Sequence, residues 1–191
     1  MARRVLAGVR VRSLLMALAL AAPAARGTAQ SGSGACALEA ASIPADHRQQ
    51  AADFLAHIKA GPFYKELLRR RGKPSTCQLA INGDNLTVTF GFRGGAQLLA
   101  KANPAIEYSE QRMDLRGLTR SQALALVKAG EKQAWGAKGC GIRWRSPDED
   151  SPGDQPGSHE VVYRGDNCNC QARLVYEKRN VLAALVLRSA C

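Results

Sequence analysis

Residues 77–92 read CQLAINGDNLTVTFGF, and this stretch decides the fold that we expect. Two β-prone runs, 77–81 and 86–92, flank the turn sequence Asn82-Gly83-Asp84-Asn85, and this pattern predicts a β-hairpin. Successive side chains of a strand point to opposite faces. One face of the second run is therefore apolar and meets a core, and it consists of Leu86, Val88, Phe90 and Phe92.

Two helices are predicted before the hairpin. Apolar residues recur at helical spacing over residues 45–59, and Ala60-Gly61-Pro62 ends this helix. Pro62 suits the first turn of a second helix, which Gly72 and Pro74 stop. Arginines gather at the end of the second helix, where positive charge complements the helix dipole.

A third helix has the sharpest local signal in the chain. Thr119, followed three residues later by Gln122, forms a capping box, and Leu118 precedes the cap as a hydrophobic staple requires. We expect this helix to run to about Trp135 and to end at Gly136, since glycine is the common residue just after a helix.

The remaining segments predict a short helix over residues 96–102 and several further strands. The strands are expected at 105–115, 139–145, 160–164, 168–177 and 181–188, with a polar loop over 146–158. This order of elements predicts an α+β fold, in which an antiparallel sheet has helices packed on one face and disulfides staple the chain.

The order also allows two tandem helix-plus-sheet units, with halves at 42–116 and 117–191. The turn sequence Gly-Asp-Asn recurs at 83–85 and 165–167, and a cysteine-led strand precedes it in both halves. In element order alone, this layout resembles the tandem helix-plus-sheet units of the secreted β-lactamase inhibitory proteins.

The N-terminus has the order of a secretory signal peptide. Arginines at positions 3, 4, 10 and 12 precede an apolar run from Ser13 to Ala25, and small residues follow. This run has about a dozen residues, whereas a membrane-spanning helix needs about 20, so we expect no transmembrane anchor. Cleavage near Ala29 leaves a flexible lead-in over 30–41 and a domain over 42–191, in the periplasm or outside the cell. A lipoprotein would acylate Cys36, but this cysteine lies well beyond the apolar run.

Removal of the signal peptide (1–29) changes the charge of the chain. It contains five of the 27 basic residues and none of the 16 acidic ones, so 22 basic residues remain and the net charge falls from +11 to +6. A moderately basic exported chain favours an acidic partner, either a protein or an anionic envelope polymer. Nucleic acid is not expected, because aromatic residues do not interleave the basic stretches.

Six cysteines remain in the mature chain, and an even number in an exported protein predicts a disulfide framework. They are Cys36, Cys77, Cys140, Cys168, Cys170 and Cys191. Cys36 and Cys77 form the simplest local pair, and a bridge between Cys168 and Cys170 would be strained, so these two are expected to pair outward. The alternative is a soft-metal site from Cys168, Cys170 and His159. It would leave Cys140 and Cys191 as thiols outside the cytosol, so we expect neither a metal nor another cofactor.

Catalytic motifs are absent from the sequence. No G-x-S-x-G, H-E-x-x-H or phosphate-binding glycine loop occurs. His47 and His57 share one predicted helix but lie ten residues apart, so they do not form the i, i+4 pair that chelates zinc. We therefore expect no enzyme, and a secreted hydrolase with an unrecognised site is the alternative.

The uncovered face of the predicted sheet is the expected binding site. It carries Thr87, Thr89, Arg93, Arg143, Arg145, Gln171 and Arg173. Arginine binds carboxylates through paired hydrogen bonds, so we expect a basic surface of Arg143, Arg145 and Arg173, with Trp144 as an aromatic anchor. The predicted function is a non-enzymatic binding or inhibitory protein that recognises an acidic protein or envelope polymer. A structural envelope protein is the remaining alternative.

Overall fold

The computed structural model describes residues 45–133, 141–144, 146–153, 157–166, 169–177 and 181–190. The predicted signal peptide, the lead-in and the cysteines at 36, 140, 168 and 191 lie outside these residues. The described part contains three α-helices: α1 (Ala45–Ala60), α2 (Pro62–Arg71) and α3 (Arg120–Glu131). It also contains two short 3-10 turns, η1 (Arg93–Gly95) and η2 (Pro104–Ile106).

Local sequence signals set the bounds of α1 and α2 and the start of α3 as predicted. Gly61 separates α1 from α2, and Pro62 occupies the first turn of α2, where no backbone N–H is needed. The predicted capping box of α3 is confirmed. The Gln122 N–H donates to Thr119 Oγ1 at 3.3 Å, and the Thr119 N–H donates to Gln122 Oε1 at 3.0 Å. The expected end of this helix near Trp135 was wrong, because α3 ends at Glu131 with Lys132 as its C-cap.

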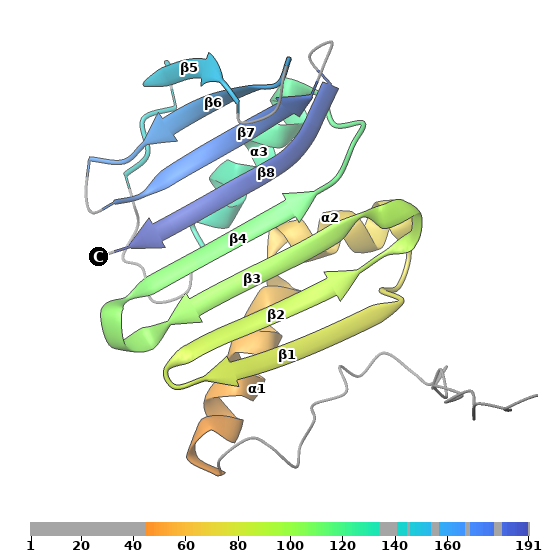
Figure 1. The fold of residues 1–191 in the computed structure, drawn as a ribbon, viewed down its shortest axis with the longest axis vertical. Coiled ribbons are helices and arrows are strands. Elements are labelled where there is room, and N and C mark those ends of the chain that lie inside the picture. The colour runs from red at the N-terminus through yellow and green to blue at the C-terminus, as the bar shows by residue number, and fades with distance from the viewer. Residues whose placement is uncertain are drawn as a thin grey trace, which may run out of the picture. The chain divides into compact units, whose positions relative to one another are not determined.

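Eight strands form one antiparallel sheet in the order β1-β2-β3-β4-β8-β7-β6-β5 (Figure 1). Each half of the chain winds inward from one edge of the sheet, and the two halves meet where β4 pairs with β8. The strands are β1 (Thr76–Asn82), β2 (Asn85–Gly91), β3 (Gln97–Asn103), β4 (Tyr108–Asp114), β5 (Glu149–Pro152), β6 (His159–Arg164), β7 (Gln171–Glu177) and β8 (Val181–Ala190).

The predicted hairpin is confirmed as β1 and β2. Asn82 pairs with Asn85, so the turn consists of Gly83 and Asp84. Gly83 has a φ of 56°, which an L side chain adopts only with strain, and this explains the glycine in the turn.

One face of the sheet is buried, and Figure 1 shows the three helices behind it. A row of buried side chains crosses six strands on this face, with each member opposite the next: Phe90, Leu98, Met113, Leu185, Leu174 and Val161. The helices add Phe54, Ile58, Phe63, Leu67, Ala123 and Val127 to the same core. At Gly130, α3 comes so close to the sheet that an added Cβ would lie 2.9 Å from Leu187 Cδ2.

The predicted fold class was wrong and is corrected as follows. The structure is dominated by one eight-stranded antiparallel sheet, accompanied by three helices in the described residues. The two halves do not form separate sheets, because Tyr108–Asp114 of β4 pairs along its whole length with β8.

The predicted disulfide framework is not seen between described residues. Cys77 and Cys170 are the described cysteines; neither is a free thiol, yet no disulfide joins two described residues. Within the described part of the chain, the hydrogen bonds of the sheet and the apolar core join the elements.

Three segment predictions also differ from the structure. Residues 96–102 were expected to be helical, but Gln97–Asn103 forms β3, because Leu98, Ala100 and Ala102 alternate into the core and the strand is paired on both sides. The strand expected over 139–145 is reduced, among its described residues, to one bridge between Ile142 and Gly165. The expected loop over 146–158 contains the short edge strand β5.

Candidate functional site

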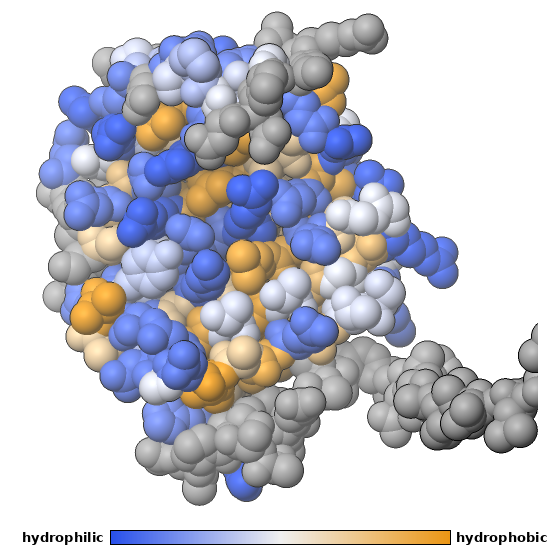
Figure 2. Space-filling view, viewed as in Figure 1, coloured by the Kyte–Doolittle hydropathy of each residue, from blue (hydrophilic) through white to orange (hydrophobic). Residues whose placement is uncertain are grey.

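The face of the sheet opposite the helices is called the open face here. On β7, Ala172 and Leu174 point into the core, so Gln171, Arg173 and Val175 point to the open face. Figure 2 views the molecule from this side and shows hydrophilic side chains across it, with apolar ones between them.

Strand register brings arginines from three neighbouring strands together on the open face. Gln171 on β7 lies opposite Arg164 on β6 and opposite Arg188 on β8, so the three side chains form one row across the sheet. Because neighbouring strands are about 4.8 Å apart, the backbones of Arg164 and Arg188 are about 10 Å apart. Arg173, the next residue of β7 on this face, adds a third guanidinium beside the row.

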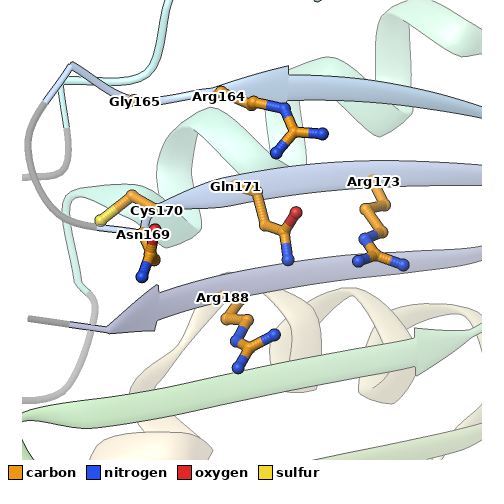
Figure 3. Close-up of a pocket in the computed structure, with 7 residues that line it drawn as sticks. All are labelled: Arg164, Gly165, Asn169, Cys170, Gln171, Arg173 and Arg188. Atoms are coloured by element: carbon orange, nitrogen blue, oxygen red, sulfur yellow. The ribbon is translucent and has the colours of Figure 1, made fainter. Parts of the chain in front are cut away.

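A pocket of 370 Å³ opens among these side chains. We call it the arginine pocket, and Figure 3 shows Gln171 between Arg164 and Arg188 in it. Backbone hydrogen bonds fix some of the residues that line it: the Gly165 N–H donates to the Cys170 carbonyl at 2.8 Å, and the Asn169 N–H donates to the Ala190 carbonyl at 2.8 Å. Its lining residues are Arg164, Gly165, Asn169, Cys170, Gln171, Arg173 and Arg188.

The charges around the arginine pocket are only partly balanced. Arg173 Nη1 lies 3.5 Å from Glu160 Oε2, so one arginine has a carboxylate beside it. Asp148 accepts a hydrogen bond from the backbone N–H of Arg164 at 2.7 Å. Arg188 forms no ion pair with any described carboxylate, and its guanidinium carbon instead lies 5.4 Å from the centre of the Tyr108 ring. The pocket therefore has an excess of positive charge.

Tyr108, on the neighbouring strand β4, holds Arg188 in place. Its hydroxyl donates to Glu110 Oε2 at 3.2 Å. Burial and, after it, the Glu110 carboxylate raise the pKa of Tyr108, although the Arg188 charge acts in the opposite direction. The phenol therefore stays neutral at physiological pH, and the face of a neutral aromatic ring attracts a guanidinium group.

The chain matches no family model, no curated protein and no solved structure. The function must therefore be argued from the chemistry of the open face.

The lining of the arginine pocket suits binding of an anion. Its polar side chains are guanidinium and amide groups, which donate hydrogen bonds, and Cys170 is not a free thiol. Among the described residues, no group of three or more His, Cys, Asp or Glu side chains is placed to hold a metal ion. Cys168, which belongs to the alternative metal set, lies outside them. In the same described part of the chain, no helix is both long enough and apolar enough to span a membrane.

Of the four residues predicted for the binding site, one lines the arginine pocket. Arg173 is that residue. Arg143 is exposed on a loop and pairs with Asp148 at 2.9 Å and with Asp166 at 3.3 Å, so its charge is compensated. Arg145 lies outside the described residues.

Trp144 is a packing residue rather than an exposed anchor. Its indole N–H donates to Glu131 Oε2 at 3.0 Å, and its ring centre lies 5.4 Å from that of Tyr163. Lys128 Nζ lies 5.6 Å from the centre of the same ring. These contacts attach the segment around Ile142 to the end of α3, where the Ile142 N–H also donates to Glu131 at 2.8 Å.

The sequence analysis missed Arg164 and Arg188. Both stand at or near the ends of predicted strands, and their alternation with buried neighbours gives the face that they occupy. The sequence does not show which strands are neighbours. These two arginines lie beside Gln171 because β6, β7 and β8 are adjacent in the sheet.

A second pocket, of 470 Å³, lies at the other end of the strands, and its charges are better balanced. Arg112 pairs with Asp114 at 2.9 Å, and Arg116 pairs with Glu177 at 2.7 Å. All four of these residues line it. This pocket is larger, and Arg71, which also lines it, has a buried Nε without a hydrogen-bond partner among the described residues. Two carboxylates, Asp114 and Glu177, line it as well, whereas none lines the arginine pocket, so the arginine pocket is the better candidate for an external anion.

Proposed function

We propose that this chain is a non-enzymatic binding protein, which recognises an acidic partner protein through the open face of its sheet. One observation carries the proposal: Arg164, Arg173 and Arg188, from three adjacent strands, surround one pocket on the face that no described helix covers. Arginine is favoured at interfaces because its planar guanidinium forms paired hydrogen bonds with carboxylates.

The apolar side chains of the open face favour a protein over a polymer. Val186 lies opposite Arg173 on one side and Arg112 on the other, and Leu99 is opposite Arg112. Protein interfaces commonly combine apolar residues with arginine. The net charge of +6 predicted for the mature chain would also attract an acidic partner.

The site of action remains part of the proposal. The N-terminal sequence predicts export, so the mature chain would meet its partner in the periplasm or outside the cell. Inhibition is one consequence that such binding would have if the open face covered the partner's own active site.

A capture experiment with charge-reversal variants tests this function. The mature protein is immobilised and exposed to the envelope fraction and medium of the source cells, and bound proteins are identified by mass spectrometry. Arg164→Glu with Arg188→Glu should abolish capture of the specific partner, and raised salt should weaken capture by the unmodified protein, because exposed charges are screened within about 8 Å at physiological ionic strength.

The matched control makes the same change in net charge, but on the helices instead of the open face. Lys65 on α2 and Lys132 after α3 are exposed, so Lys65→Glu with Lys132→Glu should leave capture intact. Capture that survives reversal of Arg164 and Arg188, or that is lost equally in both double variants, would rule out the open face. Binding that persists after proteolysis of the fraction would identify an anionic polymer instead and overturn the choice of a protein.

A further inference from the structure

Arg188 is the least satisfied cation of the arginine pocket. Its Nε is buried and has no hydrogen-bond partner among the described residues. Glu110 is its cross-strand neighbour on β4, yet that carboxylate accepts a hydrogen bond from Tyr108 and makes no ion pair with Arg188. A buried N–H of a charged group without an acceptor is unfavourable, and native proteins usually supply one.

The side chains around Arg188 supply further hydrogen-bond donors and not the acceptor that its Nε lacks. Gln171 lies opposite Arg188 across the β7–β8 pair, and its amide NH₂ group can donate to the same ligand. Arg164 extends the row beyond Gln171. Arg173 is also nearby but already shares Glu160, so it attracts a second carboxylate less strongly than Arg188 does.

Tyr108 preorganises the Arg188 side chain for ligand binding. The ring on β4 restrains the guanidinium by a cation–π contact at 5.4 Å, and Figure 3 shows the Arg188 side chain directed toward that strand. A side chain that is already ordered loses less conformational entropy when a ligand binds. A planar guanidinium also presents paired N–H donors that match the two oxygens of a carboxylate.

From these observations we propose that the arginine pocket is a receptor for a single side-chain carboxylate, supplied by a glutamate or aspartate of the partner protein. The two carboxylate oxygens accept hydrogen bonds from the Arg188 guanidinium, and the Gln171 amide donates to the same carboxylate. The inference rests on the proposed function and deepens it, because it names the group by which the acidic partner is anchored. The volume of 370 Å³ accommodates such a side chain.

The test uses the mature protein labelled with ¹⁵N and follows the arginine Nε–Hε signals by NMR. Three probes are titrated: N-acetylglutamate N-methylamide, the isosteric glutamine compound and inorganic phosphate. The glutamate probe should shift the Arg188 Nε–Hε signal in a saturable manner, and the neutral glutamine probe should bind at least about tenfold more weakly, because it lacks the charge that strengthens the hydrogen bonds.

Two substitutions on the open face sharpen the result. Arg188→Lys keeps the charge but loses the planar fork, and it should lower the affinity for the glutamate probe by about tenfold. Arg112→Lys is the matched control: it lies on the same face, pairs with Asp114 and does not line the arginine pocket, so it should have no effect. Circular dichroism verifies that both variants are folded.

The outcomes separate this inference from the proposed function. Equal binding of the glutamate and glutamine probes, tighter binding of phosphate, or an unchanged Arg188→Lys variant would overturn the carboxylate receptor. If partner capture is nevertheless lost on reversal of Arg164 and Arg188, the proposed function stands without it. If the glutamate probe binds as expected but capture survives charge reversal, the proposed function fails while the pocket still binds carboxylates.

Discussion

Replacement of Thr119 by alanine removes one of the two capping-box hydrogen bonds at the start of α3, together with the 3.0 Å hydrogen bond between its hydroxyl and Ser121 Oγ. Thr119 Oγ1 accepts from the Gln122 N–H at 3.3 Å, which is a long bond at an exposed position. Loss of such a cap costs about 0.5–2 kcal/mol, and the long distance places the expected loss near about 1 kcal/mol. The return bond from the Thr119 N–H to Gln122 Oε1 does not use the hydroxyl and survives the substitution.

The consequence is measurable in a chain of this size. A loss of about 1 kcal/mol should lower the melting temperature by about 2–4 °C, which thermal melts followed by circular dichroism resolve. Urea denaturation gives the free energy directly, and its slope should not change, because the same surface is exposed on unfolding. Thr119→Ser retains the hydroxyl and should stay within about 0.5 kcal/mol of the unmodified protein.

A second substitution shows whether the capping box acts as a unit. Gln122→Ala removes the return bond and also the acceptor for Arg70 Nη2 at 3.4 Å, so it also loosens α2 from α3. Its effect and that of Thr119→Ala should not add, because the two side chains share one network. An unchanged melting temperature for Thr119→Ala, or an equal loss for Thr119→Ser, would refute the role assigned to the hydroxyl.

Three further substitutions test the packing and the electrostatics of the fold. Gly130→Val should destabilise the protein by about 1–3 kcal/mol in urea denaturation, because even its Cβ meets buried Leu187. Glu131→Gln should cost about 1–3 kcal/mol by the same measurement, since the carboxylate accepts from both Ile142 and Trp144. The hydrogen bond from Arg69 lowers the pKa of Glu66, so this carboxylate stabilises the fold above its ordinary pKa and the benefit is lost as pH falls through the lowered value. The difference in melting temperature between Glu66→Gln and the unmodified protein should therefore shrink from pH 7 to about pH 3.

Local signals predicted the helices and the hairpin because the decisive groups are close in sequence. Thr119 and Gln122 satisfy each other's backbone N–H groups, and Gly83 forms the turn, whatever the rest of the chain does. Residues 97–103 show the limit of such reasoning. Their composition, with Leu, Ala and Lys, suits a helix, but pairing with β2 and β4 buries Leu98 and Ala100 in the core, and this tertiary gain decides the structure.

The arginine pocket could be predicted only in part, because it depends on strand order. Arg173 and Gln171 were placed on an uncovered face from alternation alone, and the structure has both in the pocket. Arg143 was grouped with them on the assumption that 139–145 is a strand, yet it lies on a loop where Asp148 and Asp166 neutralise it. Alternation gives the face of a side chain, whereas the neighbour across the sheet follows from long-range pairing that no local pattern encodes.

An irregularity in β8 explains how one strand supplies both the core and the arginine pocket. Every second residue of a regular strand lies on the same face. If β8 were regular, Leu182 would therefore share the open face with Ala184, Val186 and Arg188. The register instead shifts between Val175 and Tyr176 of β7: Val175 pairs with Ala184 but Tyr176 pairs with Leu182, so Ala183 is the extra residue of a β-bulge. Leu182 is thereby turned into the core, where it is 3% exposed, while the pairs Gln171–Arg188 and Arg173–Val186 lie on the regular side of the bulge. Because a one-residue offset exchanges the two faces of a strand, a bulge closer to the C-terminus would have moved Arg188 into the core and removed the cation on which the pocket depends.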